Sequence, residues 1–597
     1  MFQQGNYNGF GRQDVAGRAN FQTVGTSVPG VSNVTAGGGN SFASFLLGWA
    51  TDGGIDTVRY IGQQWQYFSG FVQDDFRINR KLTLFLGMRW ETTLPPKEEQ
   101  DRWSDFSPTT PNPGAGGIPG ALIYAGTGEG RQGTRTLANA WFGGYGPRIG
   151  MAYSLNDKTV IRANYARSFS AVSTTTGSTH QKGFTQTVGF GNTSTGVSPT
   201  FLFKDGVPPY PVPPFISPSF QNGADMPWWQ GQEVSRLPEQ NNLNVSIQRQ
   251  LSSSTVLDFA YNAVIGSHLQ AGLLNFNQVP FAALEKYGAQ LLNSPVDSPA
   301  AVAAGIKQPW PDFATFYRSK KITPTVAQAL RPFPQYTTIN TWDGNGDHSG
   351  HSSYHAAIVK LDKRFANGFT FTTSYVFSKL LSDADSYWIT DNPRAADHYN
   401  RKLEKSIGSY DVTHNFKFAG VYNLPFGKGQ KFATSGARAA ILGDWRLGFI
   451  GTYASGRPVG LGTSVSVPLF AGRGVPWVPG YDNWRAPVKG DKFDPNVDSF
   501  FQPASFFGAQ PANTIGNQTR LNARLRELPA YGENLNVSKE IRIRETMHFE
   551  IRGEFFNVMN RVRMGVGNTN VTSTTFGKVT GVYNSPRQIQ LGAKFVF

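Results

Sequence analysis

Apolar and polar residues alternate with a period of two along many short stretches of the chain. In residues 81–91 the even positions are Leu, Leu, Leu, Met and Trp, whereas the odd positions are mainly polar residues or Gly. A period of two sends successive side chains to opposite faces of a β-strand. The pattern therefore predicts a strand with one apolar and one polar face, which is typical of a transmembrane β-barrel.

The same alternation returns on both sides of short turn sequences, and this arrangement predicts β-hairpins. Residues 148–167 turn at 156–158, and the Asn367-Gly368 pair is a strong hairpin signal. We count about fourteen to sixteen strands of roughly 9 to 11 residues, the length that crosses an outer membrane. Strand patterns lie in residues 67–77, 81–91, 148–167, 242–261, 357–377, 412–424, 445–453, 535–543, 547–555 and 588–597.

The connections between these predicted strands alternate in length. One set has about 2 to 5 residues, and the other is long and rich in Gly, Pro and aromatic residues. Short turns at one rim and long loops at the other are typical of an outer-membrane barrel, and loops this long are unusual in compact soluble domains. Helical patterns occur only in the long loops, at 281–292 and 326–330. We therefore predict one all-β domain over residues 1–597, a transmembrane antiparallel β-barrel with extracellular loops at approximately 95–145, 168–239, 266–352, 383–410 and 456–531.

Composition favours strands over helices as the membrane-spanning elements. The chain has 597 residues, 67 Gly and no Cys, and only 39% of its residues are hydrophobic. Its longest apolar patches, such as residues 42–49, fall well short of the roughly 18 to 20 residues of a spanning helix. The net charge is 55 − 40 = +15, but the basic residues are scattered, so we expect no nucleic-acid partner.

The last predicted strand, residues 588–597, ends on two apolar-face aromatics, Phe595 and Phe597. A terminal aromatic on such a strand resembles the C-terminal signal by which Gram-negative outer-membrane proteins are recognised for insertion. Phe597 and Phe595 are therefore the predicted insertion signal. The partners expected from this pattern are outer-membrane lipid and the barrel-assembly machinery, and the expected location is the outer membrane of a Gram-negative cell.

Some loop residues have side chains suited to ligand binding. The histidines close in sequence could hold a transition metal or an iron chelate, with solvated loop histidines as the alternative. A second loop mixes aromatic and charged groups, as binding surfaces do. The predicted ligand-loop residues are His348, His351, His355, Trp388, Arg394, His398 and Arg401. Residues 343–347 imitate the start of a calcium loop but have His348 where Gly is needed, which leaves only an irregular calcium site open. We predict no resident metal or cofactor.

Charged residues on the polar faces of the strands are predicted to face the barrel lumen. Together with Asp258 and Asp362, they are expected to form charge ladders across the wall, and a polar pathway is the functional alternative. The predicted lumen-facing residues are Arg148, Arg162, Lys360, Arg364, Glu550, Arg552 and Glu554. No nucleophile and base share a motif, so we do not expect an enzyme.

Several segments, taken in order, resemble the barrel of Oar-like TonB-dependent receptors. They include FVQDDFRINRKLTLFLGMRWE (71–91), GPRIGMAYSLNDKTVIRANYARSF (146–169) and IRGEFFNVMNR (551–561). Each segment alone is a generic barrel strand with a turn, so their order and spacing carry the resemblance, which runs nearly end to end. The resemblance implies capture of an unknown ligand by the external loops, then rearrangement of a plug inside the barrel, driven by a TonB-type energy-coupling protein.

The sequence departs from this family at its front. The resemblance implies a signal peptide, a regulatory-like β-domain, a plug and a barrel of roughly 22 strands, and none of the first three is identified before Phe42. We therefore expect a fragment that holds the C-terminal barrel. Three functions stay open: a receptor and transporter, a surface-interaction or adhesion barrel without transport, and a secreted β-rich carbohydrate-binding protein or hydrolase.

Overall fold

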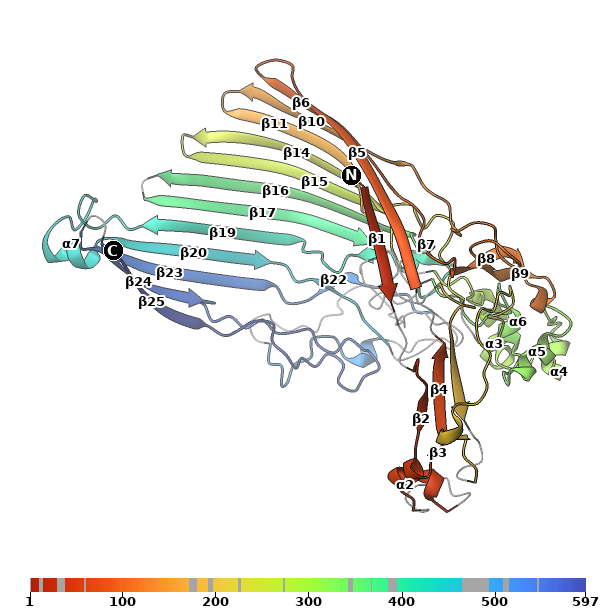
Figure 1. The fold of residues 1–597 in the computed structure, drawn as a ribbon. Coiled ribbons are helices and arrows are strands. Elements are labelled where there is room, and N and C mark those ends of the chain that lie inside the picture. The colour runs from red at the N-terminus through yellow and green to blue at the C-terminus, as the bar shows by residue number, and fades with distance from the viewer. Residues whose placement is uncertain are drawn as a thin grey trace.

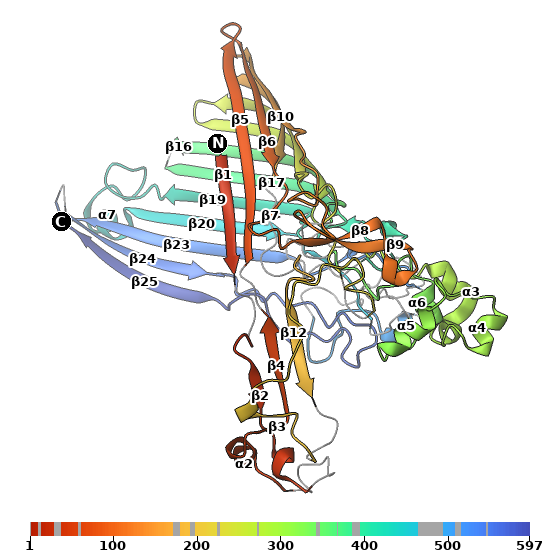
Figure 2. The ribbon, with the colours of Figure 1, turned by 45° about the vertical axis from the view of Figure 1, so that its right-hand side comes forward.

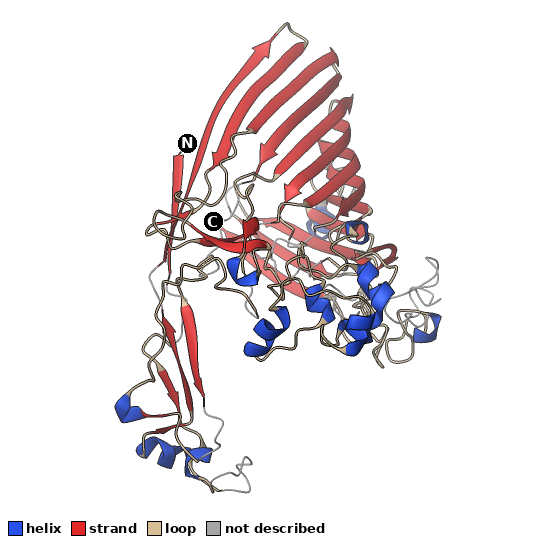
Figure 3. Ribbon diagram, turned by 90° about the vertical axis from the view of Figure 1, so that its right-hand side faces the viewer, coloured by secondary structure: helices blue, strands red, loops and turns tan. Residues whose placement is uncertain are grey.

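The main feature of the computed structural model is one large antiparallel sheet, bent into a deep trough (Figures 1 and 3). The structure describes residues 2–9, 14–28, 38–57, 61–170, 180–191, 197–223, 227–271, 274–341, 347–366, 368–384, 395–463, 493–507, 515–544 and 547–597. The sheet contains 16 described strands, which confirms the number expected from the sequence. Within the described residues no ladder joins its two edges, β1 and β25, so these strands form an open trough.

The strands of the trough follow the chain, so that nearly every neighbour in the sheet is also a neighbour in sequence. In sheet order they are β1 (Phe2–Gly9), β5 (Ile61–Arg77), β6 (Leu82–Thr93), β10 (Gly144–Asn156), β11 (Thr159–Phe169), β14 (Glu239–Ser252), β15 (Thr255–Leu269), β16 (Gly350–Ala366), β17 (Phe369–Ser382), β19 (His414–Asn423), β20 (Trp445–Ala454), β23 (Ala530–Arg542), β24 (His548–Phe556) and β25 (Gln588–Val596). The short strands β7 (Lys97–Glu98) and β18 (Ser406–Ile407) pair at the rim.

The strand register places the apolar positions of neighbouring strands opposite one another. Ile149 lies opposite Leu86 on one side and Tyr165 on the other. Val359, at the centre of the sheet, likewise lies between Phe259 and Tyr375. In the described structure the side chains of this belt are exposed, as shown by Ile149 at 55%. The alternation in the sequence thus becomes a continuous apolar belt on one face of the trough and a polar surface on the other.

The two rims of the trough differ, as the sequence predicts. Short turns join β5 to β6, β10 to β11, β14 to β15, β16 to β17 and β23 to β24. The exception is the connection 424–444, which contains α7 (Gly436–Leu442) between β19 and β20. The prediction of tight turns throughout this rim was therefore wrong at this position. The long-loop rim also carries two long connections beyond the predicted set, residues 10–60 and 557–587.

Three of the long loops fold together into a compact body at the end of the trough, here called the loop body (residues 94–143, 215–223, 227–238 and 274–341). It contains the hairpin β8 (Ser104–Pro111) and β9 (Pro119–Tyr124), with the 3-10 turn η2 (Pro113–Ala115). Its helices are α3 (Phe281–Leu292), α4 (Pro299–Ala303), α5 (Phe313–Ser319) and α6 (Val326–Ala329), drawn in green in Figure 1. The two predicted helices are confirmed as α3 and α6. The periodicity missed α4 and α5 because each covers less than two helical turns.

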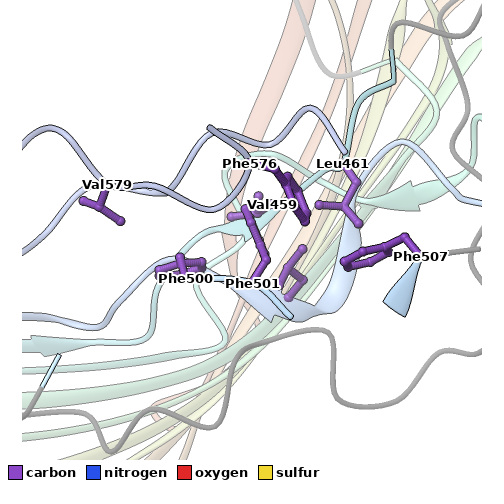
Figure 4. Close-up of a cluster of buried hydrophobic side chains, with 8 residues drawn as sticks. Val459, Leu461, Phe500, Phe501, Phe507, Phe576 and Val579 are labelled. Carbon is purple, nitrogen blue, oxygen red and sulfur yellow. The ribbon is translucent and has the colours of Figure 1, made fainter. Parts of the chain in front are cut away.

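The loops that follow β20 and β24 pack together around a second core (Figure 4). Phe501 and Phe576 stack in this cluster with ring centroids 5.0 Å apart, although 75 positions of sequence separate them. The other buried members are Val459, Leu461, Phe500, Phe507, Leu525 and Val579. The strands β21 (Pro458–Val459) and β22 (Asn522–Arg526) and the turn η7 (Ala504–Phe506) lie in the same region. These loops are therefore folded structures with hydrophobic cores.

A separate arm projects from the long-loop rim, away from the trough and the loop body (Figures 1 and 2). It is built from β2 (Arg18–Asn20), β4 (Asp52–Thr57) and β12 (Gln186–Gly191). Toward its tip lie β3 (Trp49–Ala50), which pairs with β13 (Phe201–Leu202), and η1 (Thr23–Thr26), η3 (Phe203–Asp205) and α2 (Ser41–Leu46). The tip exposes large apolar side chains, among them Phe42 at 64% and Leu46 at 69%. In the part of the chain that the structure describes, no helix is both long enough and apolar enough to cross a membrane.

Candidate ligand-binding site

All seven residues predicted to face the lumen lie on the polar face of the trough. The residues of this face mainly line two hollows of about 660 and 330 Å³. The apolar face is strongly exposed, with Ile149 at 55% and Leu591 at 80%, which places the polar face on the inside of the curve. Arg364 and Glu554 line the larger hollow, together with Asn534 and Asn536. Arg148 and Arg162 line the smaller one. The inner wall therefore offers hydrogen-bond donors and acceptors along its length.

The ion pairs on this wall run along strands, and the predicted ladders across it are not seen among the described residues. Lys360 lies opposite Asp258 in the register, yet its Nζ contacts Asp362 of the same strand at 2.8 Å. Arg552 and Glu554 pair in the same way at 3.7 Å. Residues two apart share one face of a strand, so a long side chain reaches its own strand neighbour as readily as the one across. Glu550 lies directly opposite Lys594, without an ion pair within 4.0 Å in the described structure.

Where the loop body meets β16, a buried carboxylate anchors the chain. The side chain of Asp347 is fully buried and accepts hydrogen bonds from the backbone N–H groups of Leu274 at 2.9 Å and Ser349 at 3.0 Å. Ser349 Oγ also donates to Asp347. These bonds tie the start of the third long loop to its end. The other residues of the possible calcium loop, 342–346, lie outside the described part of the chain.

The structure brings together predicted ligand-loop residues from two separate loops. Arg401 donates from Nη1 to Ser349 Oγ at 2.8 Å, and its Nη2 lies 4.0 Å from the Asp383 carboxylate. His351 Nδ1 lies 3.6 Å from the same carboxylate. Asp383 thus sits between an arginine and a histidine at the rim. The cluster therefore combines a guanidinium, an imidazole and one carboxylate, and these groups can hydrogen-bond a polar ligand.

The three histidines close in sequence do not form one site. His355 lies on the apolar face of β16, where its Nδ1 is 2.8 Å from the Tyr261 hydroxyl. His351 pairs with Asp383, and His348 is buried beneath the rim. No group of three His, Cys, Asp or Glu side chains that could hold a metal occurs among the described residues. The described structure therefore does not gather the three histidines around one point.

His398 connects the rim to the loop body. Its Nδ1 accepts a hydrogen bond from the Asn275 backbone N–H at 3.1 Å, and the backbone N–H of His398 donates to Gln278 Oε1 at 2.8 Å. Burial and the nearby Arg401 lower the pKa of His398, which suits a ring that acts as an acceptor. The two remaining ligand-loop candidates, Trp388 and Arg394, lie outside the described residues.

The sequence did not reveal the polar core of the loop body. Asn112 and Asn222, buried and 110 positions apart, exchange amide hydrogen bonds of 2.7 and 2.9 Å. Gln328 donates to the backbone oxygens of Pro334 at 2.7 Å and Tyr336 at 2.8 Å. Buried amides of this kind must be paired, so they fix one arrangement of the loops. No local pattern marks these residues, because their partners are distant in sequence.

His348 should make the rim sensitive to acid. Burial is the main cause that lowers its pKa from 6.5 to about 4, and Nε2 has no hydrogen-bond partner among the described residues. In an opened loop the pKa of His348 would lie near its ordinary value, so the open form would bind a proton at a higher pH than the folded form. Stability is therefore fully present above about pH 6.5 and declines toward pH 4, by about 1 kcal/mol at roughly pH 5.5 and about 3 kcal/mol at pH 4.

Hydrogen exchange of residues 347–366, followed from pH 7 to pH 4.5, would measure this loss. The variant His348→Gln should remove at least half of the pH dependence, and the remainder is assigned to His398. An unchanged slope in the variant would contradict the role of His348.

Phe595 and Phe597, the predicted insertion signal, lie at the end of the edge strand β25. Their ring centroids are 6.0 Å apart, and Phe597 is 89% exposed. Phe595 lies opposite Phe549 on the apolar face. Because Phe597 buries so little area, any role in stability is small.

Deletion of Phe597 should lower the yield of inserted protein in cells severalfold while leaving refolding into lipid vesicles nearly unchanged. The exposed Phe597 side chain adds little packing, so the expected loss concerns its predicted role as insertion signal. The variant Phe597→Trp, which keeps a terminal aromatic, is the matched control and should insert normally. Equal losses in cells and in vitro would show that the residue is only structural.

Comparison with known proteins gives one family and a set of distant structures. A family model described as "Outer membrane beta barrel domain" matches residues 1–590. The comparison with curated proteins gives no match.

Several solved structures match over most of the chain at low identity. The ferripyoverdine receptor of the Pseudomonas aeruginosa outer membrane is 10% identical, with 90% of this chain and 40% of that one covered and a TM-score of 0.36. The outer membrane transporter YddB from Escherichia coli is 10% identical, with 90% and 55% covered and a TM-score of 0.37. For the siderophore receptor PiuA from Acinetobacter baumannii the values are 8%, 91%, 44% and 0.37. The chain thus spans 40% to 55% of the length of these proteins.

Proposed function

The chain belongs to the outer membrane beta barrel domain family, and from this premise we propose that it is the barrel portion of an Oar-like, TonB-dependent receptor that captures a ligand with its external loops. The loop body carries this proposal. Loops from three different strand pairs share buried cores and a buried amide network, so their outer surface has a fixed shape. A fixed binding surface loses less conformational entropy when a ligand binds.

The inner wall of the trough supports passage of a polar ligand after capture. Its charged residues, including Arg148, Arg162 and Arg364, line the hollows on the concave side. The Asp383 cluster lies at the rim, at the end of the same strands. Energy coupling by a TonB-type protein acts through a plug domain, so this part of the proposal depends on a plug in the full-length protein.

One observation favours the alternative of a surface-interaction or adhesion barrel. The tip of the arm exposes Phe42, Leu46 and Leu47, and no charged residue or histidine occurs in residues 21–51. Exposed apolar patches often mark interaction sites. The alternative of a secreted, soluble β-rich protein is wrong, because the family is an outer-membrane one and the apolar belt is exposed in the described structure.

Depletion of compounds from a defined medium distinguishes transport from adhesion. Pro295 and Thr325 form a β-bridge, so a short Gly linker can replace residues 297–323 and reconnect the chain, which removes the Trp310 and Tyr317 part of the loop-body core. Cells with the intact protein should deplete at least one compound, and both the linker variant and a protonophore should stop this depletion. The exposed substitution Val302→Ala in the same segment should have no effect.

If nothing is depleted while cells still adhere or bind a partner, the adhesion alternative is correct. Depletion that survives a protonophore would contradict energy coupling but would leave the ligand-binding role in place.

A further inference from the structure

We propose that His355, Lys379 and His414 form a binding site for the phosphate group of an outer-leaflet lipid, on the outward face of the trough. The three residues lie on β16, β17 and the start of β19, toward the long-loop rim. All three are exposed and belong to the apolar face. In an outer-membrane barrel the long loops face outward, so this position corresponds to the outer leaflet.

The strand register gathers these residues into one patch. His355 lies directly opposite Lys379, and His414 lies directly opposite Phe377, which is two positions from Lys379 on the same face. The rings of Phe377 and His414 are 5.3 Å apart. Lys379 is directly opposite His355, roughly 5 Å away by Cβ, and diagonal to His414, roughly 7 to 8 Å away, so its long side chain can bring an anionic group to either histidine.

Each histidine of the patch is held by a tyrosine in the same way. The Tyr261 hydroxyl lies 2.8 Å from His355 Nδ1, and the Tyr375 hydroxyl lies 2.7 Å from His414 Nδ1. When the hydroxyl donates, the imidazole proton resides on Nε2. Among the described residues nothing hydrogen-bonds either Nε2. Each ring therefore offers an outward N–H donor even when it is neutral.

Lys379 supplies the fixed positive charge. It is exposed and has no carboxylate within 4.0 Å among the described residues, unlike Lys360, which contacts Asp362 at 2.8 Å. An unpaired lysine beside an apolar belt extends its ammonium group to the membrane interface. A phosphate oxygen there would accept from the ammonium and from either imidazole N–H group, and such charge-assisted bonds are strong.

The partner is a lipid headgroup because the patch continues the belt that lipid covers. Val359, Tyr375 and Phe377 lead directly from the centre of the sheet to the three polar groups. A lipid would place its acyl chains on these apolar side chains while its phosphate meets the patch. A free phosphate compound would gain only the polar half of this surface.

Native mass spectrometry of the detergent-purified protein tests the proposal with two probes, diphosphoryl lipid A and its dephosphorylated form. The wild type should retain the phosphorylated lipid about fivefold more than the other, because the phosphate adds charge-assisted bonds. Lys379→Gln and the double variant His355→Gln with His414→Gln should each remove most of this preference. Lys417→Gln, which changes an exposed lysine on the polar face of β19, is the matched control and should keep it.

Two further arms make the result decisive. Lys379→Arg keeps the charge and should keep the preference, and heat-modifiable migration on gels confirms that each variant is folded. Equal retention of both probes by the wild type, or an unchanged preference in Lys379→Gln, would overturn the proposal. Full displacement of the lipid by excess inorganic phosphate would overturn the lipid as the partner.

Discussion

Replacing Val359 with Arg is expected to destabilise the protein in a bilayer by about 2 to 4 kcal/mol, the cost of a lipid-facing arginine near the midplane. Val359 lies at the centre of the apolar belt, between Phe259 and Tyr375. An arginine at this position has no charged partner on the same face of the neighbouring strands. It must therefore carry its charge into hydrocarbon or distort the bilayer.

The substitution Thr372→Arg is the matched control for this experiment. Thr372 is exposed on the polar face of the adjacent strand β17, directly opposite Asp362, so a new arginine there meets a carboxylate and the water of the concave side. Denaturant unfolding in phospholipid vesicles, followed by tryptophan fluorescence, would measure both variants. Equal losses at the two positions would show that the faces are wrongly assigned.

Replacing Tyr317 with Ala should open the loop body, at a cost of about 3 to 5 kcal/mol of local stability, as for other buried aromatic residues. Its side chain is fully buried against Trp310, Phe313 and Ala314. Its hydroxyl donates to the Pro334 backbone oxygen at 2.6 Å. The substitution thus removes packing and one of the two hydrogen bonds to the Pro334 oxygen, the other being donated by Gln328.

Hydrogen exchange and limited proteolysis of residues 274–341 would detect this opening. At least a hundredfold faster exchange in the loop body is expected, since about 3 kcal/mol corresponds to that factor, while the sheet stays protected. The exposed substitution Val302→Ala in the adjacent helix should leave exchange unchanged. Faster exchange in the sheet as well would show that the two parts unfold as one unit.

The sheet was predictable from the sequence because its signals are local. Alternation in residues 81–91 assigns each side chain to a face, and the turn at Asn367-Gly368 fixes where two strands reverse. Once one face is apolar in every strand, a one-residue slip would move apolar side chains to the polar side. The observed register, with Ile149 between Leu86 and Tyr165, is the one that avoids this.

The rim was much less predictable, because its contacts join residues that are far apart in sequence. Asn112 and Asn222 pair across 110 positions, and Arg401 meets Ser349 across 52. Closeness in sequence also misled, since His355 belongs to a strand and points to the apolar face, whereas His348 is buried in the loop. The residues of the candidate site were thus partly identified, but their grouping required the three-dimensional structure.

Labelling of single cysteines in living cells tests most directly whether the chain crosses the outer membrane with its long loops outside. The chain has no Cys, so each substitution introduces the only thiol. Lys307→Cys, exposed on the loop body, should react with an impermeant maleimide on intact cells, whereas Asp157→Cys, exposed in a short turn, should react only after the outer membrane is opened. Equal labelling of both on intact cells, or labelling of Asp157→Cys alone, would contradict the account.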